Sequence, residues 1–272
     1  MQTHFWTIFA ILVSAGILSA IAILPYSLAL NPTASEQLRA QLAEKGSKIP
    51  PMLVIALAST VQAGLLIAIA TGLGLLAARA VGLRLPVLIA ALSGQPALPI
   101  LTAGLLAALL VGFGAGALIA VLERFVFQPR LPAAFRQADA KQPLWQRILA
   151  CFYGGIYEEL LLRLFVMTGL IWLIGRAWPF AAGQIPAGIF WAANILAALL
   201  FGIGHLPATA RLAPLTPFII TRALVLNGLA GVLFGVLFLR YGLELAIIAH
   251  FCADIVIHVL LPELQPAVQA AA

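Results

Sequence analysis

Residues 98–122 read LPILTAGLLAALLVGFGAGALIAVL and contain no Asp, Glu, Lys, Arg or His. A helix of these 25 residues would be about 37 Å long, which is enough to cross a hydrocarbon core of roughly 30 Å. A helix also satisfies its own backbone hydrogen bonds, which a segment surrounded by lipid requires. The stretch therefore predicts a transmembrane helix.

The rest of the chain has the same character. Its 272 residues are 63% hydrophobic and 9% charged, with a mean hydropathy of +1.10, whereas soluble domains carry about a quarter charged residues. We therefore expect an all-α, polytopic transmembrane helix bundle that forms a single integral membrane domain over residues 1–272. About seven spans are predicted, near residues 5–29, 52–78, 98–122, 147–174, 187–206, 217–239 and 243–261.

Two segments bear on this count of spans. Residues 85–94 are apolar but too short to cross a bilayer. They could lie at the interface, extend the third helix backwards, or belong to an eighth span. Residues 1–30 resemble a signal peptide, but they lack Lys and Arg, and their apolar run exceeds the usual 7–15 residues. We interpret this segment as the first spanning helix.

The net charge of +6 comes from basic residues that lie mostly between apolar runs, which does not favour a nucleic-acid partner. Cytoplasmic loops of membrane proteins are enriched in Lys and Arg, so the more basic side is expected inside. On seven spans, the loop at 123–147 is predicted to be cytoplasmic, together with the C-terminus, and the N-terminus lies on the other side. One side carries Arg39, Lys45, Lys48, Arg124, Arg130, Arg136, Lys141 and Arg147, and the other carries Arg79, Arg84, Arg176 and Arg240.

Glycines recur at a spacing of four residues in two predicted spans. The pairs are Gly112 with Gly116 and Gly231 with Gly235. Small residues at this spacing let the backbones of two membrane helices approach closely. The pattern predicts close helix packing, which a site built from several helices needs.

The fourth predicted span contains two adjacent glutamates, Glu158 and Glu159, and an arginine, Arg163. An ionised group at membrane depth costs several kcal/mol unless it is paired or hydrated. Glu159 and Arg163 stand four residues apart in the favourable acid-before-base order, so they can neutralise each other. Glu158 projects about 100° away around the helix. A structural clamp would explain one Glu–Arg pair, but a second buried carboxylate favours a function.

Two further spans carry histidines. Phe201 and His205 lie one turn apart near the end of the fifth span, and His250 and Asp254 lie one turn apart in the seventh. A carboxylate at that spacing can fix the tautomer of an imidazole. Each pattern alone is also typical of a structural role, as a helix-terminal histidine or a self-satisfied pair. His258, nearer the helix end, is expected to be interfacial or to act indirectly.

These three patterns resemble the signature of the CAAX-protease and bacteriocin-processing family of intramembrane proteases. That signature is Glu-Glu-x-x-x-Arg, then Phe-x-x-x-His, then His-x-x-x-Asn or Asp, on separate helices. All three occur here in order, within catalytic core helices over residues 145–260. The resemblance implies hydrolysis of a peptide bond by a water that Glu158 activates, with histidines assisting. The catalytic residues so predicted are Glu158, Glu159, Arg163, His205, His250 and Asp254.

The resemblance leaves the use of a metal open. A Zn²⁺ ion could be held by His205, His250 and the carboxylate of Glu159, with water as a fourth ligand. The enzyme could equally work without a metal. Asp254 stands where the family often has Asn, and this carboxylate slightly favours the metal alternative.

The expected protein is an intramembrane endopeptidase, similar to CAAX proteases, in the inner membrane of a bacterium. Its partners would be the lipid bilayer and a membrane-associated protein or peptide substrate, with no nucleic acid. Two alternatives remain: a non-catalytic scaffold or immunity protein of the same family, and a proton-coupled transporter subunit in which the acids and histidines form a relay. The transporter alternative predicts inverted repeats, which the sequence does not show.

Overall fold

The computed structural model describes residues 4–30, 36–37, 40–42, 44, 50–132 and 142–264. Within these residues the regular elements are helices and no strand occurs. Among the described residues, seven helical stretches are long and apolar enough to cross a membrane, which confirms the predicted all-α polytopic bundle. Five of the basic residues used in the topology prediction lie outside the described residues: Arg39, Lys45, Lys48, Arg136 and Lys141.

The first three spans occupy the N-terminal half. The first combines α1 (Phe5–Ala22) with α2 (Leu24–Leu30), and the second is α4 (Pro51–Val81). The third is α6 (Ala97–Leu122), which continues through the π-helix η1 (Glu123–Phe127) into the short 3₁₀-helix η2 (Gln128–Arg130).

Four spans follow. The fourth is built from α8 (Leu144–Phe152), the π-helices η4 (Tyr153–Glu158) and η5 (Leu160–Met167), and α9 (Thr168–Ala177). The fifth is α10 (Ala187–Gly204), followed by α11 (Leu206–Ala210), and the sixth is α12 (Pro217–Tyr241). The seventh runs through α13 (Leu243–Asp254), the π-helix η6 (Ile255–Leu260) and α14 (Leu261–Leu264).

Proline and glycine set several of these helix ends. Pro51 and Pro217 occupy first-turn positions, where a missing backbone N–H costs nothing. Thr216 caps α12 by accepting a hydrogen bond from the backbone N of Ile219. Gly82 follows α4 with φ +83°, a left-handed conformation that glycine adopts readily.

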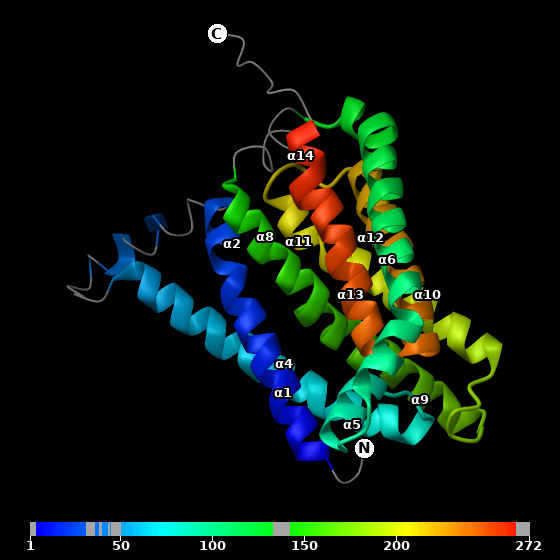
Figure 1. Ribbon diagram of the computed structural model, residues 1–272. Coiled ribbons are helices and arrows are strands. Elements are labelled where there is room, and N and C mark those ends of the chain that lie inside the picture. The colour runs from blue at the N-terminus through cyan, green and yellow to red at the C-terminus, as the bar shows by residue number, and fades with distance from the viewer. Residues whose placement is uncertain are drawn as a thin grey trace.

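Figure 1 shows the spans running alternately up and down. We call the end of the bundle that contains α2, η2, α11 and α14 the α14 end, and the opposite end the α5 end. The helix α5 (Pro86–Leu92) lies at that opposite end and is separate from α6. Residues 85–94 therefore neither cross the membrane nor extend the third span. The N-terminus of α5 is tied to the seventh span, because the backbone N of Leu88 donates a hydrogen bond to Oε1 of Glu244 at 2.8 Å.

The glycine pairs lie at close helix contacts, as predicted. A Cβ at Gly112 or Gly116 would meet the backbone of α13, at Ala249 and Ala253 respectively. In the sixth span, a Cβ at Gly231 would meet Ala198 of α10. These contacts bring α13, which carries His250, against α6, and they bring α10, which ends at His205, against α12.

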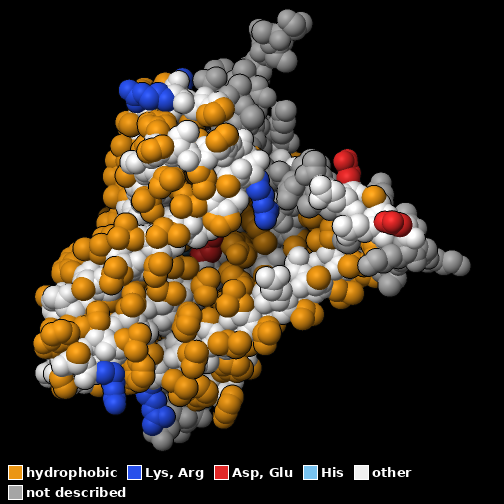
Figure 2. Space-filling model, turned by 180° about the vertical axis from the view of Figure 1, so that it is seen from behind, with side chains coloured by type: hydrophobic (Ala, Val, Ile, Leu, Met, Phe, Trp, Pro, Cys, Tyr) orange, Lys and Arg blue, Asp and Glu red, His pale blue; other side chains and the backbone are white. Residues whose placement is uncertain are grey.

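The outer surface is apolar over most of its height. Figure 2 shows a broad hydrophobic surface, with most Lys and Arg side chains near its upper and lower ends. In α4, for example, Leu57, Val61 and Leu65 are all exposed. Because a soluble monomer rarely exposes so large an apolar surface, the chain is an integral membrane protein.

Candidate active site

The two glutamates lie where the fourth span changes from one π-helix to the next. Glu158 ends η4 and Glu159 immediately precedes η5. A π-helix bonds from residue i to i+5, is rare, and is frequently found at functional sites. The side chain of Glu159 is fully buried, whereas that of Glu158 is 17% exposed. The adjacent carboxylates therefore occupy different environments.

Glu159 forms the predicted ion pair with Arg163. Nη1 of Arg163 lies 3.1 Å from Oε1 of Glu159, and Nη2 donates to the carbonyl oxygen of Gly231 at 3.2 Å. The guanidinium carbon lies 5.2 Å from the ring centre of Phe201 and 5.5 Å from that of Phe234. Burial between two aromatic rings, with a carboxylate and a carbonyl as partners, gives this charge one fixed position.

His250 connects the two glutamates. Its Nδ1 lies 2.7 Å from Oε1 of Glu159, and its Nε2 lies 3.7 Å from Oε2 of Glu158 and 3.7 Å from Oδ1 of Asp254. The ring stacks on Phe234, with 4.8 Å between centroids. A carboxylate oxygen accepts from Nδ1–H, so the ring presents Nε2 to Glu158.

His205 reaches the same carboxylate from the end of α10. Its Nδ1 lies 2.9 Å from the carbonyl oxygen of Phe201, which can only accept, so Nδ1 carries the proton. Its Nε2 lies 3.9 Å from Oε1 of Glu158. The ring also packs edge-on against Phe201, with centroids 4.8 Å apart. Both histidines are thus anchored through Nδ1 and direct Nε2 at Glu158.

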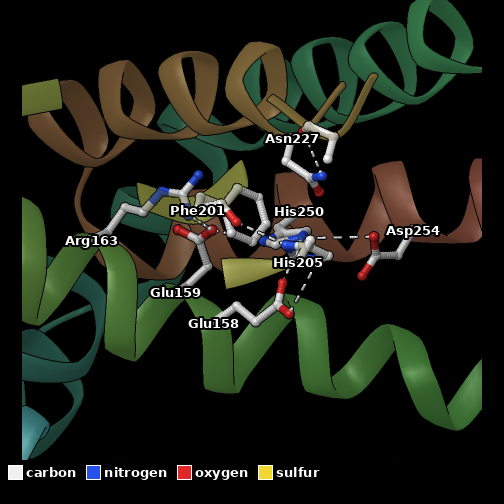
Figure 3. Close-up of polar contacts among 9 residues, drawn as sticks. Glu158, Glu159, Arg163, Phe201, His205, Asn227, His250 and Asp254 are labelled. Carbon is white, nitrogen blue, oxygen red and sulfur yellow. Dashed lines mark hydrogen bonds and ion pairs between the residues drawn. The ribbon is translucent and has the colours of Figure 1, made fainter. Parts of the chain in front are cut away.

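Figure 3 shows this convergence, with Glu158 on one helix and the rings of His205 and His250 above it. Asp254 lies on the far side of His250 from Arg163 in the same view. The structure therefore brings together the six residues that the three motifs predict, from three separate spans.

A cavity of about 440 Å³ opens beside these groups. Its wall includes Glu158, His205, His250 and Asp254, and it extends toward the α14 end, to Ser27, Gln128, Ala208 and Pro262. Glu159 does not line this cavity, although it is one of the six predicted catalytic residues. Glu159 lies behind His250, where its Oε1 atom contacts both Arg163 and the imidazole of His250.

Gly154 makes room for Asp254. A Cβ at position 154 would overlap Oδ2 of Asp254 and would lie 3.2 Å from Nε2 of His250. Glycine one turn before Glu158 therefore lets the fourth and seventh spans approach closely enough for the two acids to share the cavity. This role of Gly154 was not predictable from the sequence, because a glycine in an apolar span has many possible roles.

The cavity wall also contains polar residues for which no role was predicted, among them Glu123, Arg222 and Asn227. Arg222 of α12 pairs with Glu123 of η1, at 2.7 Å between Nε and Oε2. Asn227 lies one turn further along α12, and its Nδ2 donates to the carbonyl oxygen of Ala223 at 2.8 Å. Each is a polar side chain in or beside an apolar span, and this position was the feature of the sequence that could have marked it as a candidate site residue. His258 lines the wall nearer the α14 end.

The predicted zinc ligands do not meet at one point. Glu159 contacts Nδ1 of His250, whereas Glu158 and Asp254 face Nε2 of that ring. An ion beside Nε2 would therefore have the imidazole between itself and Glu159. In the described ranges, no three His, Cys, Asp or Glu side chains are arranged to hold a metal ion. The positions of these residues therefore do not fit the predicted set of zinc ligands.

Comparison with protein families finds a similarity over part of the chain. Residues 140–256 match the family described as type II CAAX prenyl endopeptidase Rce1-like. We call these residues the Rce1-like segment. The match confirms the resemblance predicted from the three motifs, all of which lie within the Rce1-like segment. Residues 1–139 lie outside it. Searches of curated proteins and of solved structures found no match.

Proposed function

We propose that the chain is an intramembrane endopeptidase that hydrolyses a peptide bond in a membrane-associated protein or peptide. One observation carries the proposal. The Glu158 carboxylate faces a cavity, and its oxygens lie 3.9 and 3.7 Å from the Nε2 atoms of His205 and His250. These separations exceed a direct hydrogen bond, so neither imidazole occupies the carboxylate fully. It stays available as a general base.

In the first step, Glu158 takes a proton from a water molecule as the water oxygen attacks the scissile carbonyl carbon. A C–O bond forms, the carbonyl π electrons move to its oxygen, and a tetrahedral oxyanion results. An imidazole that carries a second proton donates it from Nε2 toward this oxyanion, and a donor placed in advance stabilises the transition state. His205 and His250 both have the required direction.

In the second step, the oxyanion reforms the carbonyl and the C–N bond breaks. The proton held by Glu158 passes to the leaving nitrogen, which departs as an amine, and the carboxylate is regenerated. Arg163 and Glu159 do not touch the reacting atoms in this account. They are positioning residues, because Glu159 orients the ring of His250 and Arg163 holds Glu159.

The lining of the cavity also indicates which kind of substrate could enter it. Apolar side chains such as Ile23, Ile119 and Leu261 line it between the catalytic groups and the α14 end. A substrate that is itself membrane-bound, such as a prenylated C-terminus, would enter from that end. The charge distribution predicts that the α14 end is cytoplasmic, and we propose the inner membrane of a bacterium as its location.

The proposal is tested with the purified full-length chain in lipid vesicles. Peptides ending in a CAAX sequence, with and without a prenyl group, are incubated with the vesicles and analysed by mass spectrometry. The expected result is a shortened product and a released fragment. Their masses should add up to the mass of the intact peptide plus 18 Da, because one water is consumed per bond. Unchanged peptides across a broad panel of membrane-anchored substrates would contradict the proposal.

A further inference from the structure

A second cavity lies at the α5 end of the bundle, away from the catalytic groups. It measures about 530 Å³ and is formed where three elements meet. These are the turn after α4, the first two turns of α6 and the last turn of α12. Its lining includes Arg84, Ile100, Phe238, Leu239, Arg240 and Tyr241.

Two guanidinium groups border this cavity. Arg84 and Arg240 are both exposed, and neither forms a hydrogen bond or ion pair with any residue that the structure describes. The described residues that line the cavity include no Asp or Glu. Glu244 lies behind it, where it accepts the hydrogen bond from Leu88. The cavity therefore carries two positive charges without a compensating acid in its wall.

The rest of the wall is apolar and lies at the level of the membrane surface. Ile100, Phe238 and Leu239 face the cavity, and the ring of Tyr241 is so close to α6 that a Cβ at Gly104 would overlap it. The depth follows from the helix ends. One span ends at Val81 and another at Tyr241, so the cavity lies where hydrocarbon gives way to lipid headgroups.

We propose that this cavity binds an anionic phospholipid, with the phosphate between Arg84 and Arg240 and an acyl chain along the apolar faces of α6 and α12. Guanidinium groups form paired, charge-assisted hydrogen bonds with phosphate oxygens. Basic pockets between membrane helices bind the headgroups of anionic lipids. The volume and the apolar wall fit a lipid better than a free inorganic anion, which would use only the two arginines.

The same end of the bundle supplies a matched control. Arg79 and Arg176 are also exposed there, but they do not line the cavity. Arg176 instead stands over the ring of Trp172 at 6.0 Å. Removing these two charges changes the general electrostatics of the surface by the same amount as removing Arg84 and Arg240.

The test compares the wild-type full-length chain, the Arg84→Gln/Arg240→Gln variant and the Arg79→Gln/Arg176→Gln variant by native mass spectrometry. Each is titrated in detergent with phosphatidylglycerol, with phosphatidylcholine, and with inorganic phosphate. We expect one bound phosphatidylglycerol in the wild type and in the Arg79/Arg176 variant. We expect roughly tenfold weaker binding, or more, in the Arg84/Arg240 variant. Melting temperatures without lipid check that all three proteins are folded.

Three results would overturn the proposal. Equal retention of phosphatidylglycerol by both variants would show that the cavity is not the site. Equal binding of phosphatidylcholine and phosphatidylglycerol by the wild type would remove the role of charge. Displacement of the lipid by inorganic phosphate at a comparable concentration would indicate a site for a free anion.

Discussion

Oε1 of Glu159 lies 2.7 Å from Nδ1 of His250 and 3.1 Å from Nη1 of Arg163. One buried carboxylate oxygen therefore links an arginine of the fourth span with a histidine of the seventh. The arrangement resembles the carboxylate–histidine pairs that orient an imidazole in other sites. It divides the work between adjacent glutamates, because Glu159 supports a ring that Glu158 faces.

Arg163→Ala should destabilise the protein. The substitution strands the buried carboxylate of Glu159 and removes the side chain between Phe201 and Phe234, so the free energy of unfolding should fall by roughly 3–5 kcal/mol. Chemical denaturation in detergent micelles measures the change, with Arg176→Ala as an exposed control. Equal stability of the two variants would show that the buried pair does not hold the site together.

Gly154→Ala should impair catalysis more than folding. The added Cβ would overlap the Asp254 carboxylate and approach His250, so the Asp254 side chain must leave its observed position or the seventh span must shift. A misplacement of about 1 Å in a catalytic group can reduce the rate by about a hundredfold. Gly169→Ala, where nothing lies within 4 Å of the new Cβ, is the control. Rates of cleavage that match between the two variants would mean that Asp254 does not need its observed position.

Topology gives a prediction that is independent of activity. A cysteine introduced at Arg136 should react with an impermeant reagent only from the cytoplasmic side, because the 123–147 loop is the more basic one. A cysteine introduced at Gln184, in the loop between α9 and α10, should react from the opposite side. Cys151 and Cys252 are buried and provide a low background. Labelling of position 136 from outside would reverse the orientation.

Removal of metal ions should leave peptide hydrolysis unchanged. The basis is that the proposed steps use only Glu158 and the imidazoles, and that the predicted ligand Glu159 lies on the other side of the His250 ring from the groups that face Nε2. Activity is compared before and after dialysis against a strong chelator, and bound metal is measured by elemental analysis. A loss of activity that added Zn²⁺ restores would contradict the metal-free steps and would require the cavity residues to rearrange around an ion.

Most of the bundle was predictable because the bilayer imposes a simple rule on composition. The expected range 98–122 corresponds to α6 (Ala97–Leu122), and 217–239 corresponds to α12 (Pro217–Tyr241). The motif residues were also predictable, since ionisable groups are so rare in the spans. The Glu159–Arg163 pair followed directly from their spacing along one helix.

The relations between helices were harder to predict. Periodicity places a residue on a face of its own helix, but it does not say which helix lies opposite or how far each one is shifted. The sequence analysis therefore could not show that Glu159 would lie behind His250 instead of facing the cavity. The π-helical geometry around Glu158 and the room that Gly154 leaves for Asp254 depend on the same contacts.

The most direct test of the account is the activity of Glu158→Gln. The substitution preserves the size of the side chain but removes the base that faces His205 and His250. Purified wild-type protein and this variant are compared in vesicles on the same membrane-anchored peptide, with melting temperature as the check on folding. We predict a folded variant without measurable hydrolysis. Cleavage by the variant at a rate near that of the wild type would contradict the assignment of Glu158 as the base.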